Sequence, residues 1–393
     1  MTNSNFHEKI SLSLILLILS NYLFLSINVP EVVIKINFVL FLLVVVFFYF
    51  KNFLDNPYLK IFFTLFLIIS FGTPLYEWDP RSIWLFHAKR IFYDYSIFSI
   101  VDNYAKFSHN DYPSLAPAFS SSFAILIGYW NEVFPKISFL LMFLPPLIFT
   151  YSFLKHEKYL IFLSIVFFII GKYLFNGWAD GLIAIYFCIS AFLMYYLFLD
   201  NKQFIQKSFL NYLIAFCFFI SLSLIKNEGT ALLLILFFVT FIIGLSYSGF
   251  KKNISKFIYL SFSFIPIIFW KVFCYSNEIH NDYINDNILL NLLPRLGELN
   301  NYKLIGYFLL LNEKFLISLI FFILAFWIRR NNQLFSFVTF IVTTYIFVLF
   351  FIFLSTPVDF YFQLDSAAAR VIKTVSFTIA FFGLINLCNN KIS

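Results

Sequence analysis

Charged side chains in this chain occur in short clusters, and the stretches between them consist almost entirely of apolar residues, above all Phe, Leu and Ile. Each stretch is about twenty residues long, the length that an α-helix needs to cross a hydrocarbon core about 30 Å thick. A helix also satisfies its backbone hydrogen bonds internally, as a bilayer requires. This spacing predicts an all-α polytopic membrane protein. With 61% hydrophobic and 12% charged residues, a soluble globule is excluded.

The apolar stretches predict about twelve transmembrane helices in a single integral-membrane domain, residues 1–393. The expected spans are 9–29, 31–50, 58–76, 136–154, 159–176, 180–199, 208–226, 229–250, 256–275, 313–328, 334–356 and 371–388. The first span is too long for the core of a typical signal peptide and lacks an A-x-A-like cleavage site. We therefore interpret it as an uncleaved span.

Two kinds of charged cluster alternate along the chain. The simple kind offers only basic anchors: Lys51/Lys60, Lys155/Lys158, Lys202/Lys207, Lys251/Lys252/Lys256, Arg329/Arg330 and Lys391. The richer kind mixes acids, bases, amides and aromatic residues: 77–113, 176–180, 226–229, 277–312 and 356–370. Successive loops of a polytopic protein lie on opposite faces, and short basic loops favour the cytoplasmic face. The alternation predicts that all rich clusters meet externally, and the same bias explains the net charge of +7 without a nucleic-acid partner.

The rich clusters define two large external loops. In the first, residues 77–134, an apolar and a polar stripe along 82–98 are typical of a helix at the membrane interface. Residues 115–134 are long enough to cross, but a crossing here would place later Lys clusters outside. We expect an interfacial or partly inserted helix, which is tolerated where it lines a protein cavity. Residues 276–312 are expected to form the second loop, with a short surface helix that breaks at Pro294.

The first external loop opens with two carboxylates, Glu77 and Asp79, at the outer end of a span. A carboxylate there can take a proton from an acceptor hydroxyl, or hold a divalent cation beside a phosphate. Asp79 followed by Pro80 also fits the start of a helix. Both interpretations of Asp79 remain open, although a helix cap does not account for the nearby Lys89 and Arg90.

A second element of this loop is the run His109-Asn110-Asp111-Tyr112-Pro113. Its last four residues fit a turn before the next helix. Two histidines and two carboxylates in one loop could also bind a metal, but their spacing matches no compact ligand motif. We assign no metal ligands and keep a divalent metal ion as an alternative.

Three further clusters lie at the ends of spans. Asp180 begins an apolar run, where a carboxylate can cap the span or face a site. Lys226 and Glu228 lie between two apolar runs with almost no loop, where unpaired charges cost on the order of a few kcal/mol each. Either they neutralise each other, or Lys226 binds a phosphate. Asp359 and Arg370 precede the last expected span, and an external Arg370 requires an anionic partner.

Together these residues place acids and fixed cations around one water-accessible cleft. This set suits group transfer from a lipid-linked phosphate, because cations stabilise the leaving phosphate while a carboxylate activates the incoming hydroxyl. The chain contains no G-x-S-x-G, P-loop, H-E-x-x-H or Rossmann G-x-G-x-x-G motif.

Five of these elements resemble motifs of the GT-C glycosyltransferase superfamily, in its bacterial dolichyl-phosphate-mannose protein mannosyltransferase-like group. Trp78-Asp79-Pro80-Arg81-Ser82-Ile83-Trp84 with Ala88-Lys89 resembles the first-loop motif, and His109-Asn110-Asp111-Tyr112-Pro113 is similar to its His-x-Asp-Tyr-Pro segment. Lys226-Asn227-Glu228-Gly229 is similar to the Thr-Lys-Asn-Glu-Gly element, and Thr356-Pro357-x-Asp359 with Arg370 to the final Thr-Pro-x-Asp and Arg. Ala179-Asp180 matches an Ala-Asp before a span, although Leu182-Ile183 replaces the usual Pro-Leu. The order of all five agrees with the family.

The resemblance implies a GT-C-like fold and an inverting transferase that uses a polyprenyl-phosphate-linked sugar. It implies work on the external face of a membrane, which in a bacterium is the inner membrane, and a lipid, glycan or protein acceptor. Asp79 falls on the catalytic base, and Asp180 would contact the acceptor or a metal. From charge alone, the candidates for the donor phosphate are Lys226 and Arg370, with Lys89 or Arg90 assisting. Residues expected to support the site or touch substrate are Glu77, His109, Asp111, Tyr112, Glu228 and Asp359.

Two other functions fit a polytopic chain of this composition. A transporter or flippase for lipid-linked oligosaccharides would carry functional charges near mid-membrane and broken spans in two related halves. An O-antigen polymerase or ligase would concentrate its catalytic residues in a large late loop. The sequence shows no corresponding halves, and 276–312 only partly resembles such a loop.

Overall fold

The computed structural model describes residues 4–51, 56–98, 108–200, 208–246, 248–279, 281 and 288–388, and within them every regular element is a helix. These are α1 (Ser4–Ser26), α2 (Glu31–Lys51), α3 (Pro57–Gly72), η1 (Pro80–Trp84), α4 (Leu85–Asp94), α5 (Leu115–Ile127), α6 (Val133–Met142), α7 (Leu144–Tyr151), α8 (Glu157–Ile170), η3 (Gly171–Leu174), α9 (Ala179–Met194), η4 (Tyr195–Leu199), α10 (Phe209–Ile225), α11 (Asn227–Gly244), α12 (Ser248–Lys252), α13 (Ile254–Ser261), η5 (Phe262–Phe264), α14 (Ile265–Ser276), α15 (Ile288–Leu296), α16 (Leu299–Leu310), α17 (Glu313–Ile328), α18 (Asn332–Ser355) and α19 (Phe360–Cys388). Three of the basic anchors lie outside the described residues: Lys202, Lys207 and Lys391.

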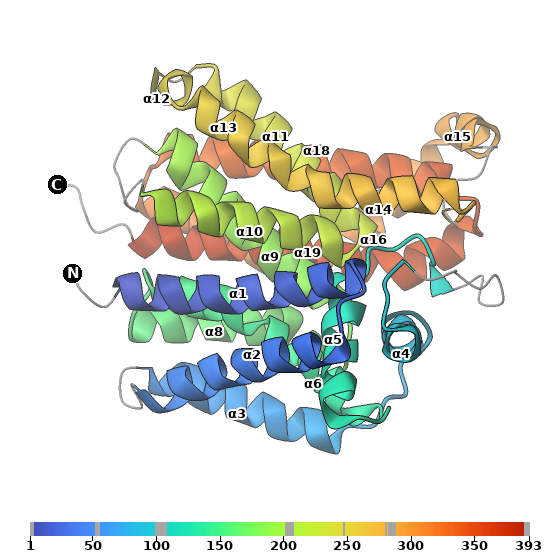
Figure 1. Ribbon diagram of the computed structural model, residues 1–393. Coiled ribbons are helices and arrows are strands. Elements are labelled where there is room, and N and C mark those ends of the chain that lie inside the picture. The colour runs from blue at the N-terminus through green and yellow to red at the C-terminus, as the bar shows by residue number, and fades with distance from the viewer. Residues whose placement is uncertain are drawn as a thin grey trace.

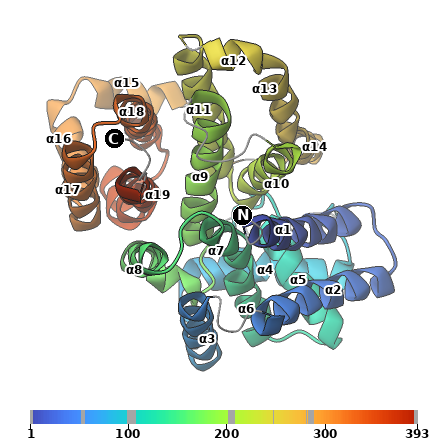
Figure 2. The ribbon, with the colours of Figure 1, turned by 90° about the vertical axis from the view of Figure 1, so that its left-hand side faces the viewer.

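The long helices run side by side in one bundle (Figures 1 and 2). Eight helical segments in the described part are long and apolar enough to cross a membrane. The pair α16–α17, bent by 69°, would make nine, and α3, α5 and α10 are shorter apolar helices. The expected all-α polytopic architecture is confirmed, whereas the number of twelve crossings stays a prediction.

One end of the bundle gathers the basic anchors. The Lys158 ammonium at the start of α8 donates to the Cys388 carbonyl at the end of α19, over 3.5 Å. The Asn386 amide donates to the Arg329 carbonyl between α17 and α18, over 2.8 Å. Figure 1 shows α1 beginning and α12 lying at this same end. We call it the basic end, and the opposite end of the bundle the polar end.

The chain leaves α3 and enters α6 at the polar end. The Lys136 ammonium in the first turn of α6 donates to the Thr73 carbonyl at the end of α3. The intervening helices α4 and α5 have 10 and 13 residues, fewer than the about 20 that a crossing needs. Figure 1 shows α5 running across the direction of the long helices, and Gly128, with a left-handed φ of +89°, caps its C-terminal end. The segment 115–134 therefore does not reverse the order of the later helices.

The last helix begins earlier than the sequence predicted. The expected span 371–388 is wrong at its start, because α19 begins at Phe360 and continues for 29 residues. The Asp359 carboxylate caps it by accepting from the Phe362 amide over 2.9 Å, and the following residues are mostly good helix formers. At 1.5 Å per residue α19 is about 43 Å long, more than a hydrocarbon core. Arg370 thus lies within a helix rather than at its entrance.

The second large loop is more helical than predicted. Instead of one short helix that breaks at Pro294, it contains α15, which continues through Pro294 to Leu296, and α16. None of the α15 side chains is buried, so a distortion of the helix at Pro294 disturbs no tertiary packing. The Arg295 guanidinium fixes α15 to the end of α18 by donating to the Thr356 carbonyl over 2.7 Å.

Candidate functional site

Asp79 and Arg370 form an ion pair at the polar end. Asp79 lies directly before η1 in the first large loop, and Arg370 lies on α19. The Arg370 Nη1 donates to the Asp79 Oδ2, and both side chains are largely buried. The other carboxylate oxygen, Oδ1, has no hydrogen-bond partner among the described residues. The Asp79 side chain therefore does not act as a helix cap, because it makes no capping bond to η1.

The environment of Asp79 acts on its proton affinity in two directions. Burial raises the pKa of Asp79 above its ordinary value, and the neighbouring Asp180 charge adds to this effect. The positive charges of Arg370 and Lys226 oppose it. The net result is a raised pKa, which makes the Asp79 carboxylate a better proton acceptor than an exposed aspartate.

A second group of charges centres on Lys226. Its ammonium lies 3.2 Å from the Asp180 Oδ1 and 2.8 Å from the Glu228 Oε1. The Lys226 and Asp180 side chains are only 7% and 9% exposed. One cation is therefore shared by two carboxylates, and the self-neutralising pair that the sequence left open is present with an additional acid. We call Asp79, Asp180, Lys226, Glu228 and Arg370 the central cluster.

The backbone around Lys226 explains how three helices bring these charges together. Lys226 is extended, with φ −162° and ψ 158°, and separates α10 from α11 without a loop. Gly229 in the first turn of α11 allows a close approach, because a Cβ there would lie 2.0 Å from the Leu222 carbonyl oxygen. Gly181 in the first turn of α9 is similarly confined, since its Cβ would lie 2.6 Å from the Tyr173 Cβ. Asp180 and Glu228 are thus each followed by a glycine that the packing requires.

Each cation of the central cluster lies against an aromatic side chain. The Arg370 guanidinium lies 4.9 Å from the centroid of the Trp178 ring. The Lys226 ammonium lies 5.6 Å from the centroid of the Tyr112 ring, which also stacks with Trp84 and with His109 at centroid distances of 5.7 and 4.7 Å. Cations over aromatic faces are attracted by the electrons of the ring.

Several buried carboxylate oxygens in this region have no hydrogen-bond partner within the described residues: Asp180 Oδ2, Glu228 Oε2 and Asp111 Oδ1. Leaving a buried acceptor unsatisfied is costly, and unmatched groups in a native fold need an explanation. Hydroxyl groups of a sugar or ordered water molecules would supply the missing donors.

Asp111 forms a second polar group beside the central cluster. Its Oδ2 accepts from the Asn227 and Asn281 amides over 2.6 and 2.7 Å and lies 3.4 Å from the Lys271 ammonium. Its carbonyl accepts from the Trp270 indole over 2.9 Å. Burial raises the pKa of Asp111, and Lys271 opposes that shift. A turn is present over residues 109–112, one residue earlier than the predicted 110–113, and is closed by the Tyr112 amide donating to the His109 carbonyl.

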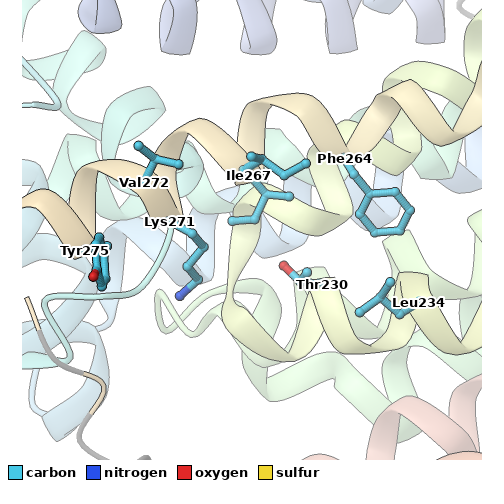
Figure 3. Close-up of a pocket in the computed structure, with 8 residues that line it drawn as sticks. Thr230, Leu234, Phe264, Ile267, Lys271, Val272 and Tyr275 are labelled. Atoms are coloured by element: carbon cyan, nitrogen blue, oxygen red, sulfur yellow. The ribbon is translucent and has the colours of Figure 1, made fainter.

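Lys271 lines an apolar groove of about 510 Å³. The groove lies between α11 and α14, and Figure 3 shows the Lys271 side chain reaching from α14 toward α11. The other lining residues include Thr230 and Leu234 from α11 and Tyr275 from α14. Since Asn227 hydrogen-bonds both Lys271 and Asp111, the groove adjoins the second polar group.

The remaining predicted residues lie at varying distances from this centre. Glu77 pairs with Lys172 over 2.6 Å, near the Trp178 ring. Lys89 is exposed on α4 and has no ion-pair partner among the described residues. Arg90 lies beside His87, where burial and the Arg90 charge lower the His87 pKa to about 4.

Two further sequence predictions concern Asp359 and a bound metal ion. Asp359 is exposed and caps α19. Across the described part of the chain, no three or more His, Cys, Asp or Glu residues are arranged to hold a metal ion.

Sequence reasoning missed Lys271, Trp270 and Lys172. Lys271 lies inside the predicted span 256–275, and a lone lysine in an apolar run is itself a signal, because such a charge is expensive unless it faces a polar site. Lys172 lies in η3, within the predicted span 159–176. The partners of these residues come from distant loops, so no local sequence pattern identifies the partners.

Comparisons of the chain with known protein families, with characterised proteins and with solved structures give no match. The likeness to GT-C enzymes rests on the motifs themselves.

Proposed function

We propose that this protein is a membrane glycosyltransferase that moves a sugar from a polyprenyl-phosphate donor to a lipid, glycan or protein acceptor. The observation that supports this most directly is the central cluster. Acids and cations from four distant parts of the chain meet at one end of a bundle of apolar helices. An isoprenoid donor is dissolved in the bilayer and carries its reactive phosphate at the membrane surface, so an enzyme acting on it needs its polar site at such a place.

In the proposed reaction, Asp79 is the general base. Its Oδ1 takes the proton of the acceptor hydroxyl while the acceptor oxygen attacks the anomeric carbon of the sugar. The bond from that carbon to the phosphate oxygen breaks on the opposite side, and the electron pair leaves with polyprenyl phosphate. A single displacement of this kind inverts the anomeric configuration. The raised pKa of Asp79 favours the proton transfer.

The other members of the cluster have complementary roles in the proposal. Arg370 favours the ionised form of Asp79 and adds positive charge to the site from which the phosphate leaves. Lys226 adds a second cation, held in place by Asp180 and Glu228. The free oxygens of Asp180 and Glu228 are suited to accept hydrogen bonds from sugar hydroxyls. We propose that the site faces the external side of a bacterial inner membrane, because the basic anchors gather at the other end.

The test is a transfer assay on membranes that contain the protein. Polyprenyl-phosphate donors carrying radiolabelled mannose, glucose or galactose are incubated with the membranes, and the label is followed after extraction. We expect label to leave the donor lipid and free polyprenyl phosphate to appear. Label that stays on the donor lipid but changes leaflet would instead identify a transporter, and an unchanged donor in every case would reject both activities.

A further inference from the structure

A group of three lysines lies beside the central cluster, outside the sequence-predicted site. Lys172 belongs to η3, Lys314 to the first turn of α17 and Lys373 to α19. We call them the lysine trio. Lys373 and Arg370 are three residues apart on one helix, so their side chains share a face.

Contacts with one short stretch of chain bring the trio together. The Lys373 ammonium donates to the Tyr173 hydroxyl over 2.6 Å, and the Lys314 ammonium lies 3.5 Å from the Ile169 carbonyl oxygen. Tyr173 directly follows Lys172, and Ile169 is in the last turn of α8. All three lysines therefore surround the end of α8, and the charges of Lys314, Lys172 and Arg370 all repel that of Lys373.

The positive charge of this group is not matched. Lys172 pairs with Glu77, but Lys373 and Lys314 have no carboxylate within ion-pair distance in the described part of the chain. Asp180 and Glu313 attract them only from farther away. The carbonyls at a helix C-terminus offset roughly half an elementary charge, less than two lysines carry. Half-buried like charges at the edge of an apolar bundle are expensive and mark ion or substrate sites.

The central cluster has the opposite character. Lys226 already faces two carboxylates, and Arg370 is paired with Asp79. A dianionic phosphate therefore finds uncompensated cations at Lys373 and Lys314 rather than at Lys226. One turn of α19, about 5 Å, separates this place from Arg370.

We propose that Lys373 and Lys314, with the Tyr173 hydroxyl as a third donor, form a binding site for a phosphate monoester. Given the proposed function, its ligand is the polyprenyl phosphate that the reaction releases. In the intact donor the same phosphate is a monoanionic diester, with its sugar directed toward Asp79 and Arg370. The same chemistry would bind free inorganic phosphate, so the test must separate the two sources.

The test measures ligand binding by the full-length protein in detergent, without any transfer reaction. The probes are farnesyl phosphate, farnesol and inorganic phosphate, and binding is followed by the ligand-dependent shift in Tm and by titration. We expect farnesyl phosphate to bind and farnesol not to bind. Lys373→Gln and Lys314→Gln should each weaken the Kd about tenfold or more, the loss of one charge-assisted hydrogen bond. Lys373→Arg keeps the positive charge and should still bind farnesyl phosphate, which would show that the position tolerates substitution.

The matched control is Lys256→Gln. Lys256 also lies over an aromatic ring, Tyr212 at 4.8 Å, but belongs to α13, which starts toward the basic end. The affinity of the Lys256→Gln variant for farnesyl phosphate should equal that of the wild type. Equal binding of inorganic phosphate and farnesyl phosphate, lost in both Gln variants, would keep the site but assign it to a free anion. Unchanged affinity in Lys373→Gln and Lys314→Gln would overturn it. Binding without sugar transfer would leave this site standing and reject the glycosyltransferase.

Discussion

Asp79 and Arg370 meet in an ion pair although 291 residues of chain separate them. Asp79 lies in the first large loop, directly before η1 and the short helix α4. Arg370 lies on α19, which has 29 residues and is the longest described helix. This contact joins the beginning and the end of the set of motifs that the sequence singled out. It also leaves one oxygen of Asp79 without a partner among the described residues, next to a fixed positive charge.

Replacing Asp79 by Asn tests the proposed base. The amide keeps the size of the side chain and its contact with Arg370 but cannot take a proton at the reacting oxygen. We expect sugar transfer to fall by a factor of about 10² or more, the usual contribution of a general base. Initial rates of label transfer measure this, with Asp365→Asn, an exposed change on α19, as the control. Wild-type rates in Asp79→Asn would remove Asp79 from its role.

The pH dependence of transfer should report the Asp79 carboxyl. Because its pKa is raised by burial, the base is lost as pH falls through a value above the ordinary one of about 3.9. Arg370 lowers that pKa, so Arg370→Gln should move the acid limb of the pH–rate profile to higher pH as well as reduce the rate. Arg330→Gln, at the basic end, should leave the limb in place. A limb that does not move in Arg370→Gln would show that another group titrates.

Removing the Lys226 charge should destabilise the fold. In Lys226→Met two carboxylates keep their places without the buried cation, and breaking a buried ion pair in this way costs about 3–5 kcal/mol. The expected result is a clearly lower Tm in detergent. Adding Asp180→Asn should recover part of the loss, since one uncompensated charge is then gone. If the single variant melts like the wild type, the cluster does not contribute to stability.

The close contact at Gly229 gives a prediction that concerns packing alone. Gly229→Ala would place a Cβ 2.0 Å from the Leu222 carbonyl oxygen, so α10 and α11 would have to move apart. We expect a lower Tm and impaired transfer. Gly306→Ala in α16 is the matched control, because a Cβ there meets nothing within 4 Å and alanine favours a helix by up to about 1 kcal/mol. Equal behaviour of the two variants would contradict the tight packing.

The sequence predicts the helical class well, because apolar length alone requires helices. The alternation of clusters also leads to the grouping of Asp180, Lys226 and Arg370, since loops of one parity share a face. The start of α19 is not predictable in this way, because the helix continues through the more polar stretch 363–370, where the fall in hydropathy ends the apolar run. The sequence does not place Lys373 and Lys271 in the site for another reason. Each is a single charge in an apolar run, and tertiary packing determines which residues it contacts.

The direct passage from α10 into α11 has a consequence for how the chain can vary. Lys226, Asn227 and Glu228 face three different partners within a single turn, and each residue of an α-helix is rotated by about 100° from the last. One amino acid inserted or deleted at this junction would therefore turn the downstream side chains away from Asp111 and Lys226 at once. Related chains that keep this chemistry should differ freely in the length of their large loops and never in the length of this junction.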